Sequence, residues 1–352
     1  MFSNFSNWII FPKPEEGFYE YVAGNNPLKN TDKKKSCFGY IQYPKKWNDN
    51  NLLNFFSIDE RGVFSENNCQ TAHKKTSVGT ITYPDKELYL KNINKIKNHI
   101  QLGDIYEMNY CISLSAKSEY FDPLHTYFIL NKISNAPHSC LAKFGNIYVI
   151  CASPERFLKR VGDKIITQPI KGTIRRGSTT AEDEQLKSQL MSSEKERSEH
   201  IMAVDVARND LSVIAKPGTV IAEELYGIYS YRQVHQMVST VSCVQKNNLI
   251  FEKIIEATFP MASMTGAPKI RAMQLIDDFE NFKREFYSGS IGLILENGDF
   301  DFNVVIRSII YDESKKTLKI AVGSAITHLS DPEAEWEECM VKAKALVAVL
   351  KK

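Results

Sequence analysis

The strongest constraint on the fold lies near the C-terminus, where three strand-like segments follow one another closely. "FYSGSIGLIL" and "FDFNVVIRSIIY" are separated only by Glu296-Asn297-Gly298-Asp299, and "TLKIAVGSAIT" follows after "DESKK". Asn-Gly favours a tight turn with positive φ at both central residues, and such a turn joins neighbouring antiparallel strands. The sequence therefore predicts an antiparallel meander over residues 286–327.

Helical periodicity alternates with strand-like runs in the rest of the chain. Apolar residues recur at three- and four-residue steps from Asp85 to Gly103, and again over about 193–207, about 268–279 and from Pro332 onwards. "DIYEMNYCISLSA" predicts a strand, and turns at Gly145-Asn146 and Gly162-Asp163 predict further hairpins. The pattern favours an α/β or α+β fold in which antiparallel hairpins are prominent.

Composition excludes several classes of protein. The chain has 352 residues and a net charge of +2, so nothing indicates a nucleic-acid partner. Its seven cysteines are scattered without a C-x-x-C pair, which is typical of reduced thiols packed as small apolar residues. The N-terminus lacks a secretory pattern and no apolar run is long enough to span a membrane. We therefore expect a cytoplasmic protein without a membrane partner.

Two pairs of acidic residues lie on predicted helices. Glu196 and Glu199 are three residues apart, as are Glu335 and Glu338, so each pair projects from one helix face. Four such carboxylates would suit Mg²⁺. The alternative is helix capping, because acidic residues in a first turn complement the helix dipole. These segments alone leave both interpretations open.

Two basic residues stand in apolar surroundings. In "TQPIKGTIRRG", Lys171 follows an apolar run, and as an isolated feature it is either a solvated lysine or a reactive amine. Burial beside Ile165, Ile166 and Ile170 would lower its pKa. Arg307 lies in a predicted apolar strand, where its guanidinium needs either an internal acidic partner or a ligand carboxylate.

Eight segments together resemble the chorismate-utilising enzymes, and they occur in the order found in that family over roughly residues 100–352. They are "GDIYEMNYCISL", "ASPERFL", "PIKGTIRRG", "EKERSEHIMAVDVARNDL", "SMTGAPKIRAMQLID", "FYSGSIGLI", "DFNVVIRSI" and "GSAITHLSDPEAEWEECMVKAKAL". The resemblance implies an α+β fold like that of anthranilate synthase component I, an α/β sandwich with antiparallel sheets flanked by helices. Residues 1–85 would form its N-terminal part, a reduced regulatory region, and residues 86–352 the chorismate-binding catalytic domain.

The resemblance also implies roles for single residues. Lys171 matches a lysine that marks aminodeoxychorismate synthases and forms a covalent adduct with the substrate, whereas anthranilate synthases carry alanine there. Glu155 matches the general acid/base. Glu199 and Glu338 match direct Mg²⁺ ligands, and Glu196 and Glu335 match the outer pair. The implied substrate contacts are Gly172, Thr173, Thr265, Gly266, Tyr287, Arg307, Gly323 and Lys342.

The implied reaction is the amination of chorismate to 4-amino-4-deoxychorismate, a step toward 4-aminobenzoate and folate. No glutaminase pattern is apparent, so ammonia would come from a separate glutamine amidotransferase subunit in a heterodimer. An anthranilate or isochorismate synthase is the alternative enzyme, and a non-enzymatic anion-binding module is a third interpretation.

Three segments depart from the family pattern. Tyr106-Glu107 stands where members more often have Tyr-Gln, and "ASMTGAPK" stands where they have "GSVTGAPK". Gln236 occupies the position of a histidine in anthranilate synthases. Because the N-terminal part is short, we also expect no feedback control by tryptophan.

Overall fold

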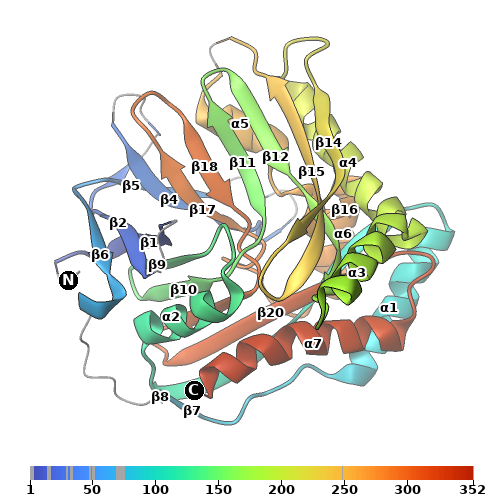
Figure 1. Ribbon diagram of the computed structural model, residues 1–352, viewed down its shortest axis with the longest axis horizontal. Helices are drawn as coiled ribbons and strands as arrows, with labels where there is room; N and C mark the ends of the chain where they lie inside the picture. The colour runs from blue at the N-terminus through green and yellow to red at the C-terminus, as the bar shows by residue number, and fades with distance from the viewer. Residues whose placement is uncertain are drawn as a thin grey trace.

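Two large antiparallel sheets form the centre of the molecule in the computed structural model (Figure 1), which describes residues 4–13, 17–28, 31, 35–46, 49, 52–68, 76–247 and 249–351. Sheet A runs in the order β16 (Gly266–Ala267), β8 (Glu107–Tyr120), β20 (Thr317–Ile326), β19 (Ser308–Asp312), β10 (Ile147–Cys151), β9 (Cys140–Phe144), β1 (Asn7–Pro12), β2 (Phe18–Ala23) and β6 (Glu60–Ser65), and β7 (Ser77–Val78) pairs with β8. Sheet B runs in the order β13 (Ile170–Arg175), β15 (Val234–Val244), β12 (Lys164–Gln168), β11 (Arg156–Val161), β18 (Phe300–Asn303), β17 (Ser290–Ile294), β4 (Cys37–Ile41), β5 (Leu53–Ser57) and β3 (Pro27–Leu28), and β14 (Ile221–Ser230) pairs with β15. Strands from before residue 85 thus extend both sheets.

Helices cover the outer sides of this pair of sheets. They are α1 (Lys86–Gln101), α2 (Pro123–Ser134), α3 (Thr180–Ser192), α4 (Glu194–Ile214), α5 (Phe251–Thr258), α6 (Lys269–Phe279) and α7 (Pro332–Leu350), with the short 3₁₀ helices η1 (Glu66–Asn68) and η2 (Ala262–Met264). In Figure 1, α7 and α1 lie side by side along β20, while α4 packs against β13 and β15 of sheet B. None of the helices in the described segments is long and apolar enough to cross a membrane.

The alternation of side chains along the strands divides the interior into two cores. In β1, Trp8 and Ile10 point into the core that sheet A shares with α1, α2 and α7, whereas Ile9 points into the core between the sheets. The second core also includes aromatic contacts across the gap, such as Phe38 with Phe144 at 6.5 Å between ring centroids. Both faces of sheet A are therefore buried at its central strands, which explains the mostly apolar sequences of β9, β10 and β19.

Most predicted elements are confirmed. Asp85 caps α1 by accepting a hydrogen bond from the Leu88 N–H, and Asp331 caps α7 in the same way. The turns at residues 145–146 and 162–163 join β9 to β10 and β11 to β12. The six cysteines that the structure describes are free and buried, as expected, and Cys69 lies outside the described residues.

The predicted strand over residues 300–311 is wrong in one respect, because it is two strands in different sheets. β18 belongs to sheet B and β19 to sheet A, and Val304–Arg307 crosses between them. Arg307 therefore lies at the crossing, not within an apolar strand, and its φ is 49°. A left-handed conformation ends the extended run just where the chain changes sheets.

Candidate active site

A buried ion pair joins the ends of the two sheets. Lys171 lies on β13 of sheet B and Glu107 lies at the start of β8 in sheet A, and the distance from Lys171 Nζ to Glu107 Oε1 is 2.5 Å. Their side chains are only 9% and 4% exposed. Lys171 is therefore a buried residue, and the interpretation as a solvated lysine at a strand end is wrong.

The charges around Lys171 decide its protonation state. Burial works toward a lower pKa, but the carboxylates of Glu107, Glu199 and Glu155 outweigh it and raise the pKa above its usual value. The expectation that apolar neighbours lower this pKa is thus wrong for the protein without substrate. In this state Lys171 is an ammonium group.

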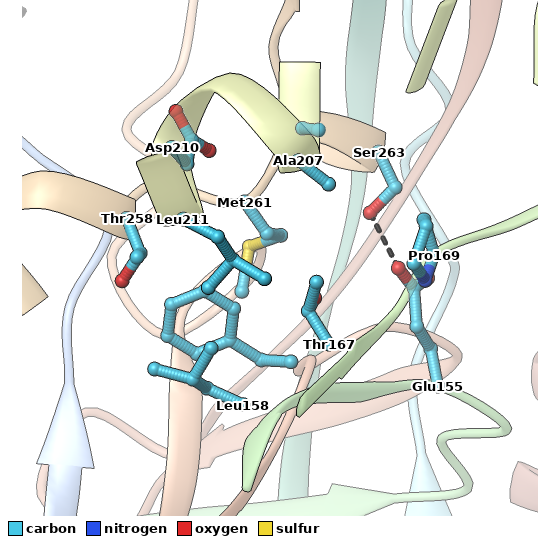
Figure 2. Close-up of a pocket in the computed structure, with 12 residues that line it drawn as sticks. Glu155, Leu158, Thr167, Pro169, Ala207, Asp210, Leu211, Thr258, Met261 and Ser263 are labelled. Atoms are coloured by element: carbon cyan, nitrogen blue, oxygen red, sulfur yellow. Dashed lines mark hydrogen bonds between the residues drawn. The ribbon is translucent and has the colours of Figure 1, made fainter. Parts of the chain in front are cut away.

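Glu155 lies in the connection between β10 and β11, and only 4% of the residue is exposed. Burial raises the pKa of its carboxyl to about 7, although the Ser263 hydroxyl, the Lys171 charge and the Arg307 charge act in the opposite direction. Ser263 Oγ donates a hydrogen bond of 2.6 Å to Glu155 Oε1 (Figure 2). A carboxyl group of this kind holds or releases a proton near neutral pH, as a general acid/base must.

A small cavity borders Glu155. Its volume is about 10 Å³, which is room for about one water molecule. Figure 2 shows Leu211 and Met261 on its apolar wall, and Asp210 and Thr258 at its far end. This cavity is too small for a substrate, but it shows that the apolar packing beside the Glu155 carboxyl is not complete.

The two acidic pairs lie on the first two turns of α4 and α7. Burial and the nearby carboxylates of Glu338 and Glu335 raise the pKa of Glu196, and burial raises the pKa of Glu199 to about 7. Glu338 has the opposite shift: burial opposes it, but Lys342, whose Nζ lies 2.6 Å from Glu338 Oε1, lowers its pKa. The pairs therefore interact electrostatically across the gap between the two helices.

The chemistry of this donor set fits a hard divalent cation, because all four groups are carboxylates and those on α4 are partly dehydrated beside negative neighbours. Among the residues that the structure describes, no three acidic, histidine or cysteine side chains are close enough to hold a metal as they stand. A cation would have to draw the carboxylates of α4 and α7 together.

Hydrogen bonds connect the elements that carry several of the predicted substrate residues. Asn109 on β8 donates from Nδ2 to the Ser263 carbonyl, and its backbone N–H donates to the Thr265 carbonyl. Lys342 Nζ donates to the Gly323 carbonyl at 2.8 Å. These contacts bring η2, β8, β20 and α7 together at one end of sheet A.

The glycines of the predicted site have close protein neighbours. A Cβ on Gly266 would lie 2.2 Å from the Glu107 carbonyl oxygen, and one on Gly323 would lie 2.5 Å from Cys111 Sγ. Gly172 has a φ of 78°, and a Cβ there would lie 3.1 Å from Glu196 Oε2. All three positions need glycine for packing or conformation, whether or not they contact substrate.

The remaining predicted residues are placed as follows. The Arg307 side chain is partly buried, burial lowers the pKa of its guanidinium, and no described side chain forms an ion pair or hydrogen bond with it. Tyr287 is buried, and burial raises the pKa of its hydroxyl strongly. Thr173 is exposed on β13 and accepts a hydrogen bond from Gln236 Nε2. A partly buried guanidinium without an ion-pair partner is costly, so Arg307 is available for an anionic ligand.

Sequence reasoning missed two residues of the site. Glu107 was noted only as a departure from the family pattern, and the structure places its carboxylate against Lys171. Ser263 binds Glu155 and lies within a segment that also departs from that pattern. For Glu107 the departure itself was the available signal, whereas Ser263 matches the family pattern and only its neighbours Ala262 and Met264 depart from it.

The comparisons with known proteins agree with this geometry. The chain is 42% identical over 267 residues to the chloroplastic aminodeoxychorismate synthase of Arabidopsis thaliana, covering 74% of this chain and 29% of that protein. It is 36% identical over 262 residues to an anthranilate synthase component 1 of Haloarcula marismortui, covering 74% and 52%. The chain spans only about a third of the length of the curated aminodeoxychorismate synthases that it matches.

The fold has solved counterparts as well. The menaquinone-specific isochorismate synthase of Escherichia coli superimposes with a TM-score of 0.82 at 16% identity, covering 100% of this chain and 90% of that one. The α+β fold with antiparallel sheets flanked by helices is thereby confirmed. The profile of chorismate binding enzymes matches residues 7–348, nearly the whole chain. The chain therefore belongs to the family of chorismate binding enzymes.

Proposed function

We propose that this chain is component I of an aminodeoxychorismate synthase, which replaces the C4 hydroxyl of chorismate with an amino group. The observation that carries the proposal is the burial of the Lys171 amine in the same site as the Glu155 carboxyl, which has a pKa of about 7. The relatives named aminodeoxychorismate synthase, at about 40% identity, support it.

The two groups divide the reaction between them. Hydroxide is a poor leaving group, and Glu155 would protonate the departing C4 oxygen. Lys171 would attack C2 of the ring as the hydroxyl leaves and form a covalent adduct. Ammonia would then add at C4 and expel the lysine. Arg307, Tyr287 and Lys342 would hold the substrate, with Arg307 paired to a carboxylate.

Magnesium is part of the proposal, and the residues that would hold it are the carboxylates of α4 and α7. Glu199 and Glu338 would contact the ion directly, while Glu196 and Glu335 would act from the outer positions. When bound, Mg²⁺ would draw charge from the ring carboxylate of the substrate and fix its orientation. Its positive charge would also relieve the repulsion that raises the pKa of Glu196.

The ammonia would come from a separate glutamine amidotransferase subunit. The product, 4-amino-4-deoxychorismate, would still need a lyase to become 4-aminobenzoate. The second candidate is an anthranilate synthase, because relatives of that name match at 36% identity. Lys171 favours the first candidate, since the family resemblance gives anthranilate synthases an alanine at that position.

Product analysis tests the proposal. The protein is incubated with chorismate, ammonium and Mg²⁺, and the products are separated and weighed with and without an added lyase. We expect a non-aromatic amine that gives 4-aminobenzoate only when the lyase is present. An aromatic 2-aminobenzoate formed without lyase would show an anthranilate synthase instead, and no turnover of chorismate would favour a binding module.

A matched variant tests the nucleophile. Lys171→Ala should give no protein adduct with chorismate in intact mass spectrometry, while wild type gives one. Glu182→Gln, on the exposed first turn of α3, is the control and should behave like wild type. An adduct of the same mass on Lys171→Ala would exclude Lys171 as the nucleophile.

A further inference from the structure

Glu107 is held rigidly against the amine of Lys171. Only 3% of Glu107 is exposed, and its backbone is paired with Ala267 in β16. The preceding residue, Tyr106, donates its N–H to the Ala267 carbonyl at 2.7 Å. Gly266 packs closely on the Glu107 carbonyl, since a Cβ there would lie 2.2 Å from the carbonyl oxygen. The carboxylate is therefore fixed in position before any substrate arrives.

This contact sets a requirement for the lysine chemistry. An amine attacks carbon only when its lone pair is free, so the ammonium form of Lys171 must first lose a proton. Among the residues that the structure describes, Glu107 is the one whose side chain hydrogen-bonds to Lys171 Nζ. Glu155 cannot serve, because it needs its own proton for the leaving hydroxyl. We propose that Glu107 is the proton acceptor that converts the Lys171 ammonium group into the attacking amine, an inference that rests on the proposed function.

Physical chemistry favours this transfer once the site is filled. Moving the proton from Lys171 to Glu107 turns a buried ion pair into two neutral groups, and the net charge of the site does not change. Substrate binding removes water, and a medium of lower dielectric constant disfavours the charged pair. A glutamine at this position, as in many family members, would leave solvent as the destination of the proton. The extra carboxylate thus gives this chain an internal route.

The proton balance closes over a full cycle. Glu107 takes a proton from Lys171, the Nζ lone pair forms the C2–N bond, and the C4–O bond breaks as Glu155 protonates the oxygen to give water. Ammonia then forms the C4–N bond while the C2–N bond breaks and its electron pair returns to Nζ. Glu155 accepts the surplus proton of the new ammonium group, and Glu107 returns its proton to the amine. All three side chains end as they began.

The test measures the rate of adduct formation with chorismate and Mg²⁺ in the absence of ammonia, by rapid quench and intact mass spectrometry. Glu107→Gln keeps the shape of the side chain but cannot accept the proton, so the rate should fall about 100-fold. The dissociation constant of chorismate should change less than about threefold, because the substitution removes an interaction that acts only in the transition state. Glu107→Asp keeps a carboxylate that can accept the proton. It should therefore form the adduct at least about tenfold faster than Glu107→Gln, a factor that general base catalysis can supply. Glu313→Gln removes a carboxylate from an exposed lysine pair and should match wild type.

A rescue experiment protects the test against a loss of folding in any one variant. In Glu107→Ala, added formate should speed adduct formation, and formamide should not, because only formate accepts a proton. Equal rates with formate and formamide would overturn the inference, as would a Glu107→Gln rate close to that of wild type. If wild type itself forms no adduct while it still aminates chorismate, the covalent route in the proposed function fails first and the role of Glu107 fails with it.

Discussion

Glu155 allows a direct test of how burial sets the chemistry of the site. The change is Glu155→Gln, which keeps the side-chain shape and an oxygen that can accept the Ser263 hydrogen bond. The variant removes only the ability to ionise. It is studied without substrate or metal, so that folding stability alone is measured.

The magnitude follows from the pKa of Glu155. Burial raises it from the usual 4.5 to about 7. The folded protein therefore keeps this proton to a higher pH than the unfolded chain does, and wild type loses stability as the pH rises from 4.5 to 7. At about 1.4 kcal/mol for each pH unit, the full cost above pH 7 is about 3 kcal/mol. About 2.5 kcal/mol of that cost falls between pH 5 and pH 8.

The assay is urea unfolding of both proteins at pH 5 and pH 8. We expect Glu155→Gln to gain about 2.5 kcal/mol relative to wild type between these two conditions. The comparison with wild type cancels other groups that titrate in both proteins, such as Glu199. As a control, Glu182→Gln should show no such change. Hydrogen bonds from Ser178 and an ion pair with Arg175 lower the pKa of Glu182 to about 2, so it is ionised at both pH values.

One result would refute the reasoning. If the stability difference between wild type and Glu155→Gln is the same at pH 5 and pH 8, the carboxyl does not titrate in this range. Glu155 would then be ionised throughout, and it could not supply a proton to a leaving group at neutral pH.

Three other predictions concern the ligands and the backbone. Arg307→Gln should lower kcat/KM for chorismate by about 10²-fold or more, because it removes a partly buried charged partner; steady-state kinetics within threefold of wild type would contradict its role as an anion clamp. Glu199→Gln should weaken Mg²⁺ binding at least about tenfold in a calorimetric titration, since a ligating carboxylate is lost, and unchanged affinity would remove it from the metal site. Gly172→Ala should lower the free energy of unfolding by about 1–2 kcal/mol, because its φ is 78° and the new Cβ meets Glu196; an unchanged urea midpoint would argue against strain there.

Local features of the fold could be predicted because they depend on neighbouring residues. The cap at Asp85 and the turn at Gly145 are each written in a few consecutive positions. α3 was missed because only Asp183 and Leu190 are buried along it, which leaves little hydrophobic periodicity to detect. The pairing of β8 with β20 joins residues about 200 positions apart, and no local pattern encodes such a contact.

The break between β18 and β19 shows a second limit. Residues Val304, Val305 and Ile306 are as apolar as a strand interior, because they cross the core between the two sheets. Hydrophobicity reports burial, and it does not distinguish a strand from a buried crossing. The left-handed backbone at Arg307, immediately before β19, completes the crossing, and the residue type does not reveal it.

The protonation of Lys171 shows why the protonation states of active-site residues are harder to predict from the sequence than the identity of those residues. The apolar residues before it in the sequence suggested a lowered pKa, and burial does act in that direction. The sign is reversed by nearby carboxylates, above all that of Glu107, which is 64 positions away and hydrogen-bonds to Lys171 from the other sheet. With the Glu107 carboxylate beside it, Lys171 is protonated in the absence of substrate. Its reaction as a nucleophile therefore requires a group that accepts this proton.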